Sequence, residues 1–290
     1  MSITAQTATR KIAVLGAGSW GTALALNCAR QSSQFVYLWG HHRQHVTDLN
    51  RWRENRRYLP GVALPENIQA TDDIAVVYDC DALLLVVPST AFAEVLAQIQ
   101  PYFAHQAIGW AIDYAVVAGP SFAKEVAANL PTAVTVAGNS LVFAQQFARF
   151  LHSKNLRTYT SDDIIGAQIG GALKNVIAIA AGIADGLGFG ANTRALSGLG
   201  DLLLTCTDDL SRNRRFGLLL GQGRSVEQAL ADIGQTVEGL FTAQEAQHYA
   251  QQYAVRAPII DIVAAILSNQ LSVDAAMQQL LRHQPKPEID

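Results

Sequence analysis

A glycine-rich turn is the first feature of the chain whose residue types and spacing predict chemistry. Gly16, Gly18 and Gly21 follow the pattern GxGxxG, between an apolar run at Lys11–Leu15 and a run with helical spacing at Thr22–Arg30. In such a strand–turn–helix unit the glycines permit a tight turn and a close approach of the backbone to a pyrophosphate, which the helix N-terminus attracts. The turn therefore predicts a dinucleotide site; a glycine turn without a ligand is the alternative.

The residues after the second apolar run, Phe35–Trp39, bear on the choice of cofactor. NAD sites usually place Asp or Glu there to hold the ribose hydroxyls. This chain has Gly40-His41-His42-Arg43 instead. Because Arg43 and a histidine can face a 2′-phosphate, the segment favours NADP, or the use of both cofactors, over strict NAD. The alternative is that these are solvated loop residues.

Lys174 is the first candidate for acid–base chemistry. It lies in GGALKN, inside an apolar stretch with helical spacing. Lysine is rarely buried unless it is paired or has a function, and desolvation lowers its pKa toward neutrality, where it can exchange a proton. A lysine that extends to solvent is the alternative.

Three further segments contain candidate substrate ligands. Asp201 follows GLG and either caps a helix or pairs with Lys174. The segment SRNRR at Ser211–Arg215 has three arginines in four residues, which suits a phosphate group or, alternatively, a solvated face. Ser121, in Gly119–Phe122, either begins a helix or meets the substrate.

The pattern of apolar runs predicts an α/β N-terminal Rossmann-like doubly wound sheet and an all-α C-terminal domain. Strands at Lys11–Leu15, Phe35–Trp39 and Asp81–Val87 alternate with helices, as at Ala91–Gln100, which indicates a parallel sheet. The later helices are expected at Ile164–Ile183, Asp201–Thr207, Ser225–Asp232 and Thr242–Tyr253, with two more beginning near Pro258 and Ser272. We place the dinucleotide-binding domain at residues 10–160 and the helical substrate and catalytic domain at residues 161–290.

One region conflicts with this pattern. Ala107–Trp110 and Tyr114–Ala118 both look like strands, with almost nothing between them. Parallel neighbours need a connection of about a dozen residues or more. The two segments therefore form a hairpin, or residues are missing between them.

Composition narrows the class of protein. The 290 residues are 50% apolar and carry a net charge of −3, which argues against a nucleic-acid partner. Cys28, Cys80 and Cys206 are far apart and form no CxxC, so we expect no disulfide and no metal site. The apolar stretch Val176–Ala184 is shorter than the roughly 20 residues of a membrane span, and residues 1–10 contain no apolar block of a signal peptide. We expect a cytoplasmic protein.

Several short segments, in order along the chain, together resemble the bacterial NAD(P)-dependent glycerol-3-phosphate dehydrogenase family. They are GAGSWGTALA (Gly16–Ala25), LWGH (Leu38–His41), YLPG (Tyr58–Gly61), AGPSFAKE (Ala118–Glu125), GGALKN (Gly170–Asn175), GLGDLLLTC (Gly198–Cys206), SRNRRFG (Ser211–Gly217) and VEG (Val237–Gly239). The resemblance implies reversible reduction of dihydroxyacetone phosphate to sn-glycerol 3-phosphate, with NADP or NAD, for phospholipid synthesis. It also implies a homodimer.

The resemblance implies a role for each matching residue. Lys174 and Asp201 match catalytic positions, Lys174 as the residue that exchanges a proton with the alcohol and Asp201 as the residue that orients it. The matching cofactor-binding residues are Gly16, Gly18, Ser19, Trp20, Gly21, His41, Ala123, Arg212, Val237 and Glu238. The matching substrate-binding residues are Gly119, Ser121, Lys174, Asp201, Ser211, Arg212 and Asn213, with Arg212 at the phosphate.

The chain departs from the family at two junctions. The family has a segment that begins Thr-Lys-Gly where Ala111 here runs directly into Ile112, and a further helical segment where Ala195 runs into Leu196. We interpret both junctions as missing loops; if they are real deletions, one substrate lysine is gone. The alternatives to the family activity are another two-domain NAD(P) reductase, of the ketopantoate or 3-hydroxy acid type, and a non-catalytic nucleotide sensor.

Overall fold

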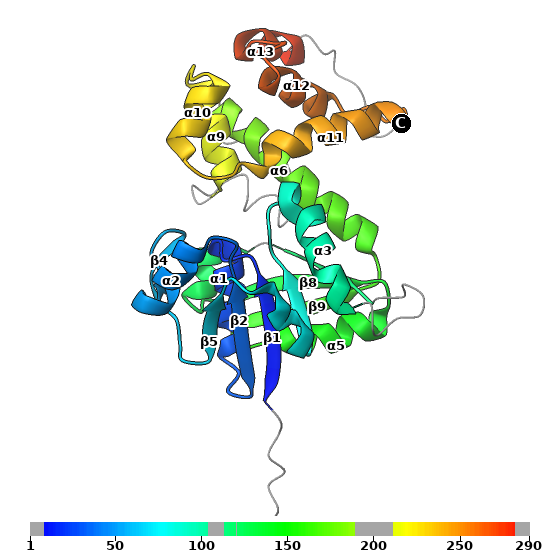
Figure 1. The fold of residues 1–290 in the computed structure, drawn as a ribbon. Coiled ribbons are helices and arrows are strands. Elements are labelled where there is room, and N and C mark those ends of the chain that lie inside the picture. Colours follow the sequence, from blue (N-terminus) through cyan, green and yellow to red (C-terminus); the bar gives the residue numbers. More distant parts are fainter. Residues whose placement is uncertain (1–8, 104–112, 120, 189–210, 282–290) are drawn as a thin grey trace, which may run out of the picture. The chain divides into compact units, whose positions relative to one another are not determined.

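The computed structural model describes residues 9–103, 113–119, 121–188 and 211–281 (Figure 1). The contacts between Cα atoms divide the chain into two units, Met1–Ala167 and Gln168–Asp290. We call them the N-terminal and the C-terminal unit and describe each by itself. The domain boundary predicted between residues 160 and 161 stays a prediction.

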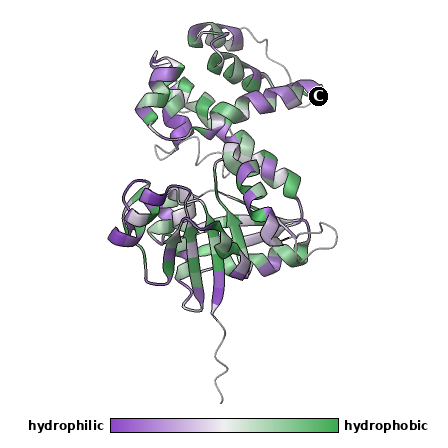
Figure 2. Ribbon diagram, viewed as in Figure 1, coloured by the Kyte–Doolittle hydropathy of each residue, from purple (hydrophilic) through white to green (hydrophobic). Residues whose placement is uncertain are grey.

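A parallel sheet forms the centre of the N-terminal unit. Its strands are β1 (Arg10–Leu15), β2 (Gln34–Trp39), β5 (Ile68–Thr71) and β6 (Ala82–Leu85), in the order β5-β2-β1-β6. The strands predicted from the first three apolar runs are therefore confirmed. Their hydropathy is high along most of their length, as expected of strands covered on both faces (Figure 2).

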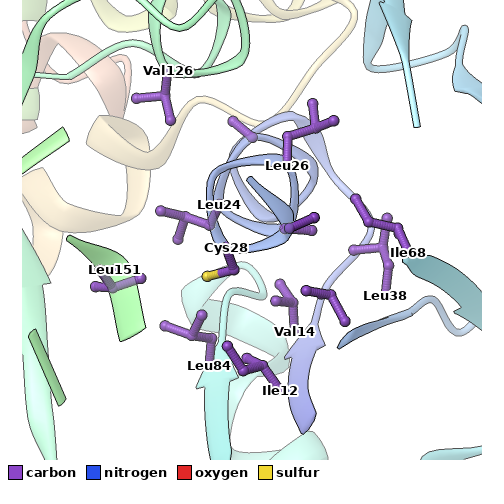
Figure 3. Packing of buried hydrophobic residues seen from close by; sticks show 14 of the residues in the cluster. Ile12, Val14, Leu24, Leu26, Cys28, Leu38, Ile68, Leu84, Val126 and Leu151 are labelled. Carbon is purple, nitrogen blue, oxygen red and sulfur yellow. The ribbon is translucent and has the colours of Figure 1, made fainter. Parts of the chain in front are cut away.

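Alternate side chains of β1 enter two different cores. Ile12 and Val14 pack with Leu24 and Cys28 of α1 (Ser19–Ala29), and Figure 3 shows these residues gathered around that helix. The other face of the sheet packs against η1 (Ile74–Asp79) and α3 (Ser89–Phe103), with α3 where a helix was predicted. Helices on both faces confirm the doubly wound fold class.

A second sheet, of three strands, completes the N-terminal unit. It contains β7 (Ala115–Ala118), β8 (Thr132–Gly138) and β9 (Leu156–Ser161), with β7 antiparallel and β9 parallel to β8. The strand predicted at Tyr114–Ala118 is thus confirmed and pairs with β8, while its expected neighbour at Ala107–Trp110 lies outside the described residues. The remaining elements are α2 (Arg43–Trp52), β3 (Glu54–Asn55), β4 (Leu59–Ala63), α4 (Ala123–Ala127) and α5 (Leu141–Leu151).

The C-terminal unit is helical throughout its described residues. Its helices are α6 (Ile164–Gly186), whose first four residues belong to the N-terminal unit, α9 (Arg212–Gly221), α10 (Val226–Ile233), α11 (Glu238–Gln252), α12 (Pro258–Leu267) and α13 (Val273–Leu281). This confirms the predicted helical character, with α11 beginning four residues before the predicted Thr242. The helix predicted at Asp201–Thr207 lies outside the described residues.

Among the described helices, α6 alone is long and apolar enough to cross a membrane by length and composition. The core helix of a globular unit passes the same test. Val176, Ile179 and Ile183 of α6 are buried against the other helices of the C-terminal unit.

Glycines let α6 and α9 pack with their backbones in contact. Gly182 and Gly186 of α6 face Gly217 and Gly221 of α9, and a Cβ atom on Gly217 would overlap the carbonyl oxygen of Ile179. This spacing of small residues permits a close helix crossing. A buried ion pair joins the same two helices, because Arg214 Nη2 lies 2.6 Å from Asp185 Oδ2.

Replacing the glycine at this crossing should destabilise the fold. Gly217→Ala should lower the free energy of unfolding by about 1–3 kcal/mol, because its methyl group has no space. The matched control is Gly170→Ala in α6, where nothing lies within 4 Å of the added atom; it should be neutral or stabilising by up to about 1 kcal/mol. Urea denaturation followed by circular dichroism measures both, and equal stabilities would contradict the proposed role of the crossing.

Candidate functional site

The glycine turn lies between β1 and α1 and has the geometry of a phosphate cradle. Gly16 has φ of +125°, and a Cβ atom there would overlap the Val86 carbonyl oxygen; one on Gly21 would overlap the carbonyl of Gly16. Nothing lies within 4 Å of a Cβ atom on Gly18. No described side chain caps α1 at Gly18, so the first N–H groups of the helix are available to an anion. The turn therefore fits a dinucleotide pyrophosphate.

Buried polar side chains hold the turn in place. Asn55, which is 0% exposed, donates through Nδ2 to the Ala17 carbonyl at 3.0 Å and to Thr22 Oγ1 at 2.7 Å. Thr22 in turn donates to the Gly18 carbonyl at 2.7 Å. His45 Nε2 lies 3.3 Å from the same Ala17 oxygen, to which it can donate. Asn55 and His45 are functional candidates that the sequence analysis missed, because nothing local to them indicates burial beside the turn.

The other predicted cofactor residues of this unit surround the carboxyl end of β2 and the start of α1. Ser19 and Trp20 begin α1 and are half-buried. His41 follows β2 and lines a groove of about 660 Å³. Burial lowers the pKa of His41, the neighbouring His42 lowers it further, and the Glu94 carboxylate opposes both effects.

The segment after β7 contains three more predicted residues. A Cβ atom on Gly119 would lie 2.9 Å from the Ala133 carbonyl oxygen, so the chain needs a glycine there. Ser121 is half-buried. It does not cap α4, because the N-cap of that helix is the next residue, Phe122. Ala123 is the first residue of α4 and packs against the core of the unit.

In the C-terminal unit, three helices meet at the predicted catalytic and substrate residues. Lys174 and Asn175 are neighbours on α6, Ser211 caps the start of α9 through its bond from Arg214 N, and Val237 precedes α11. Val237 is buried and Lys174 is half-buried. Asp201, the predicted partner of Lys174, lies outside the described residues.

Asn213 links the three helices through hydrogen bonds. Its Nδ2 donates to Asn175 Oδ1 at 2.9 Å, and its Oδ1 accepts from the backbone N–H of Gly239 at 3.0 Å. A Cβ atom on Gly239 would lie 2.9 Å from that same Asn213 oxygen, so glycine is needed for the contact. The sequence analysis did not name Asn175 and Gly239 as site residues, although the segments GGALKN and VEG contain them. Their roles depend on contacts of α6 and α11 with α9, which lie far apart in the sequence.

The three arginines of SRNRR have different environments. Arg214 is buried against Asp185, and Arg215 is exposed. Arg212 is the first residue of α9; burial lowers the pKa of its guanidinium, while the Glu238 carboxylate opposes the shift. Arg214 is therefore part of the α6–α9 packing, and the role of this segment in binding a phosphate stays a prediction. Arg212 remains the candidate anion ligand.

Metal ligands do not gather anywhere in the described part of the chain. No group of three or more His, Cys, Asp or Glu residues there could hold a metal ion.

Comparison with known proteins gives matches over nearly the whole chain. A family model for the NAD-dependent glycerol-3-phosphate dehydrogenase N-terminus matches residues 11–112 and 103–144, and one for the C-terminus matches residues 163–196 and 194–278. A glycerol-3-phosphate dehydrogenase (NAD(P)+) of Xanthomonas euvesicatoria pv. vesicatoria is 43% identical over 97% of each chain. The crystal structure of a glycerol-3-phosphate dehydrogenase from Coxiella burnetii is 38% identical, with a TM-score of 0.87 over 95% of this chain and 99% of that one.

The matches also break at two places. Each family model matches in two pieces, which meet within residues 103–112 and 194–196, next to Ala111 and Ala195. The alignment with the Xanthomonas relative spans 331 positions, more than the 290 residues of this chain. The relative therefore has internal residues that this chain lacks, and the breaks coincide with the two junctions noted in the sequence.

A side chain at Gly18, where the turn has free space, should prevent nucleotide binding without destabilising the fold. Gly18 has φ of −79°, which any residue adopts, and free space around it. Gly18→Val should leave the melting temperature unchanged but weaken NADPH binding about tenfold or more, because it fills the space that the pyrophosphate needs. Fluorescence titration and a thermal melt measure the two effects. Undiminished NADPH affinity would exclude the turn as the cofactor site.

Proposed function

Because the chain belongs to the NAD-dependent glycerol-3-phosphate dehydrogenase family, we propose that it catalyses the reversible reduction of dihydroxyacetone phosphate to sn-glycerol 3-phosphate. The cofactor is NAD or NADP. The observation that supports this reaction best is the hydrogen bond between Asn175 and Asn213, because it joins the helix that carries Lys174 to the helix that begins at Arg212. The candidate proton donor and the candidate phosphate ligand thus lie on adjoining elements.

The residues of this site have complementary tasks in the proposed reaction. The reduced nicotinamide, when bound, supplies the hydride that reduces the ketone carbon. Lys174 gives a proton to the ketone oxygen as it becomes the hydroxyl, and Arg212 holds the phosphate at the start of α9. Binding the phosphate away from the reacting carbon uses binding energy to align the ketone with Lys174. Asp201 orients Lys174 in this proposal.

The first experiment is a turnover assay with two ketones. Oxidation of NADPH and of NADH is followed by absorbance with dihydroxyacetone phosphate and with dihydroxyacetone. Turnover of the phosphorylated ketone alone is expected. Equal turnover of both ketones would contradict the phosphate site at Arg212 and favour a reductase of the ketopantoate or 3-hydroxy acid type.

A non-catalytic nucleotide sensor is the second candidate. It is favoured by the break in the family match at residues 103–112, since the family segment expected there carries a lysine that contacts substrate and cofactor. NADPH binding without turnover of either ketone would favour it. A homodimer, a cytoplasmic location and a role in phospholipid synthesis remain proposals that rest on the family.

Lys174→Ala should remove the proton donor. We expect kcat to fall about 10²- to 10⁴-fold, the usual worth of a positioned acid, with the Kd for NADPH unchanged. The exposed Lys154 provides a matched control, and Lys154→Ala should retain full turnover. A parallel loss of NADPH affinity in Lys174→Ala would instead assign this lysine to the cofactor site.

Arg212→Ala should affect binding of the phosphate more than the chemical step. We expect KM for dihydroxyacetone phosphate to rise about 10- to 100-fold, as for the loss of one or two charged hydrogen bonds, with a smaller change in kcat. Arg215→Ala, at the exposed position three residues on, is the control and should change KM little. If Arg212→Ala unfolds the protein while Arg215→Ala does not, Arg212 is structural.

A further inference from the structure

The end of α1 contains none of the predicted site residues, yet its side chains bind the ends of two other helices. Asn27, Arg30 and Gln31 donate hydrogen bonds to backbone carbonyls at the carboxyl ends of α4 and α5. The last carbonyls of a helix have no partner within it and need one outside. α1 therefore connects the glycine turn, at its start, to the helices that flank the second sheet.

Arg30, the C-cap residue of α1, binds the end of α4 with both arms of its guanidinium group. Nη1 lies 2.9 Å from the carbonyl oxygen of Val126, and Nη2 lies 2.6 Å from that of Ala127. These are partly buried, charge-assisted hydrogen bonds, which are stronger than bonds between neutral groups. Because a planar guanidinium meets two successive carbonyls, it fixes the rotation of α4 about its axis as well as its position.

The backbone alone leaves the last of these carbonyls without a donor. α4 ends at the left-handed residue Asn129, with φ of 59°, in a Schellman motif whose hydrogen bonds reach the carbonyls of Glu125 and Val126. The motif does not reach the carbonyl of Ala127. A continuing helix would supply the N–H of the residue four positions on, but that residue is Pro131, which has none. The guanidinium provides this hydrogen bond instead.

The other end of α4 carries predicted site residues. Ala123 is its first residue, and Ser121 lies two residues earlier. The N-cap residue, Phe122, makes no side-chain hydrogen bond, and a helix of five residues is not stable by itself. The start of α4 therefore depends on contacts made further along the helix. One of these is the packing of Val126 in the same core as Leu24 of α1 (Figure 3).

We propose that Arg30 is a positioning residue for the proposed reaction: by binding the end of α4 to α1, it fixes Ser121 and Ala123 relative to the glycine turn. The inference rests on the proposed function and on the substrate and cofactor roles predicted for these two residues. It gives α1 two tasks. Ser19 and Trp20 at its start serve the cofactor, and Arg30 at its end holds the segment that meets the substrate.

Gln31 offers a matched control, because it makes the same kind of contact with a helix that carries no predicted site residue. Its Nε2 lies 2.8 Å from the carbonyl oxygen of His152, the C-cap residue of α5, and 3.2 Å from that of Phe150. Gln34 Nε2 donates to Gln31 Oε1 at 2.8 Å and holds the amide in this orientation. Loss of either side chain should lower the melting temperature, but only the loss of Arg30 should affect the site.

Steady-state kinetics with NADPH and dihydroxyacetone phosphate tests the proposal. Arg30→Met keeps the apolar stem and removes the guanidinium. We expect KM for the ketone to rise about 10- to 100-fold, with kcat within about threefold of wild type, because a binding group displaced by about 1 Å has effects of this size. Arg30→Lys, which restores a charged donor, should recover part of the loss, and Gln31→Ala should keep the wild-type KM. Unchanged KM in Arg30→Met, or an equal rise in Gln31→Ala, would overturn the proposal.

A double-mutant cycle shows whether Arg30 acts through Ser121. Ser121→Ala alone should raise KM for dihydroxyacetone phosphate. If Arg30 acts by placing Ser121, Arg30→Met should raise KM much less in the Ser121→Ala background than in wild type. Additive effects of the two substitutions would refute the assignment. If Arg30→Met does not fold, the cycle is run with Arg30→Lys, and the same comparison decides.

Hydrogen exchange separates this inference from the proposed reaction, because it needs no turnover. In Arg30→Met the amides of α4 should exchange faster while those of α5 stay protected, and Gln31→Ala should show the reverse. If wild type turns over neither ketone, the proposed reaction is rejected, while selective loosening of α4 with weaker NADPH binding would still support Arg30 as a positioning residue. Wild-type turnover with unchanged exchange of α4 in Arg30→Met would keep the reaction and reject the role of Arg30.

Discussion

The close approach of backbone to backbone at glycine positions is the constraint on which the rest of this structure depends. In the C-terminal unit, α6 and α9 touch where Gly182 and Gly217 leave no side chain between them. Only at that separation can the short side chain of Asn213 reach Asn175 on the neighbouring helix. A methyl group at the crossing would push the helices apart. The carboxamide of Asn213 would then be too short to reach Asn175. The site is therefore a consequence of the packing of its supporting helices.

The same constraint operates in the N-terminal unit by different means. Gly16 and Gly21 let β1 and α1 approach, and the backbone polar groups exposed by so tight a turn need partners. The fully buried Asn55 supplies them from β3, which is distant in sequence. A buried amide is costly unless its hydrogen bonds are made, so this network favours one conformation of the turn over its alternatives. A cradle of fixed shape loses less entropy when a pyrophosphate binds.

Sequence reasoning succeeded where the signal is local. The glycine turn, the strands on either side of α1 and the helical second half could all be predicted from neighbouring residues. The sequence analysis did not predict strands β8 and β9, because their polar and apolar residues do not alternate strongly. It also did not identify Asn55 and Gly239 as site residues. Those residues act through contacts with segments far along the chain, which spacing does not show. The resemblance to a family supplied roles for Lys174 and Arg212 that residue types alone left open.

The three arginines of SRNRR show why residue type is an incomplete guide to function. Arg214 lies in the interior, where an unpaired charge is very costly, so loss of its partner Asp185, at 2.6 Å, would strongly destabilise the fold. Arg215 is exposed and well hydrated, so it gains little from holding an anion. Arg212 is between these extremes: burial has already removed part of its water, and Glu238 balances its charge only partly. In the proposed reaction, a phosphate that arrives at Arg212 replaces lost hydration at little further cost, and this intermediate environment is the reason for proposing Arg212, among the three arginines, as the substrate ligand.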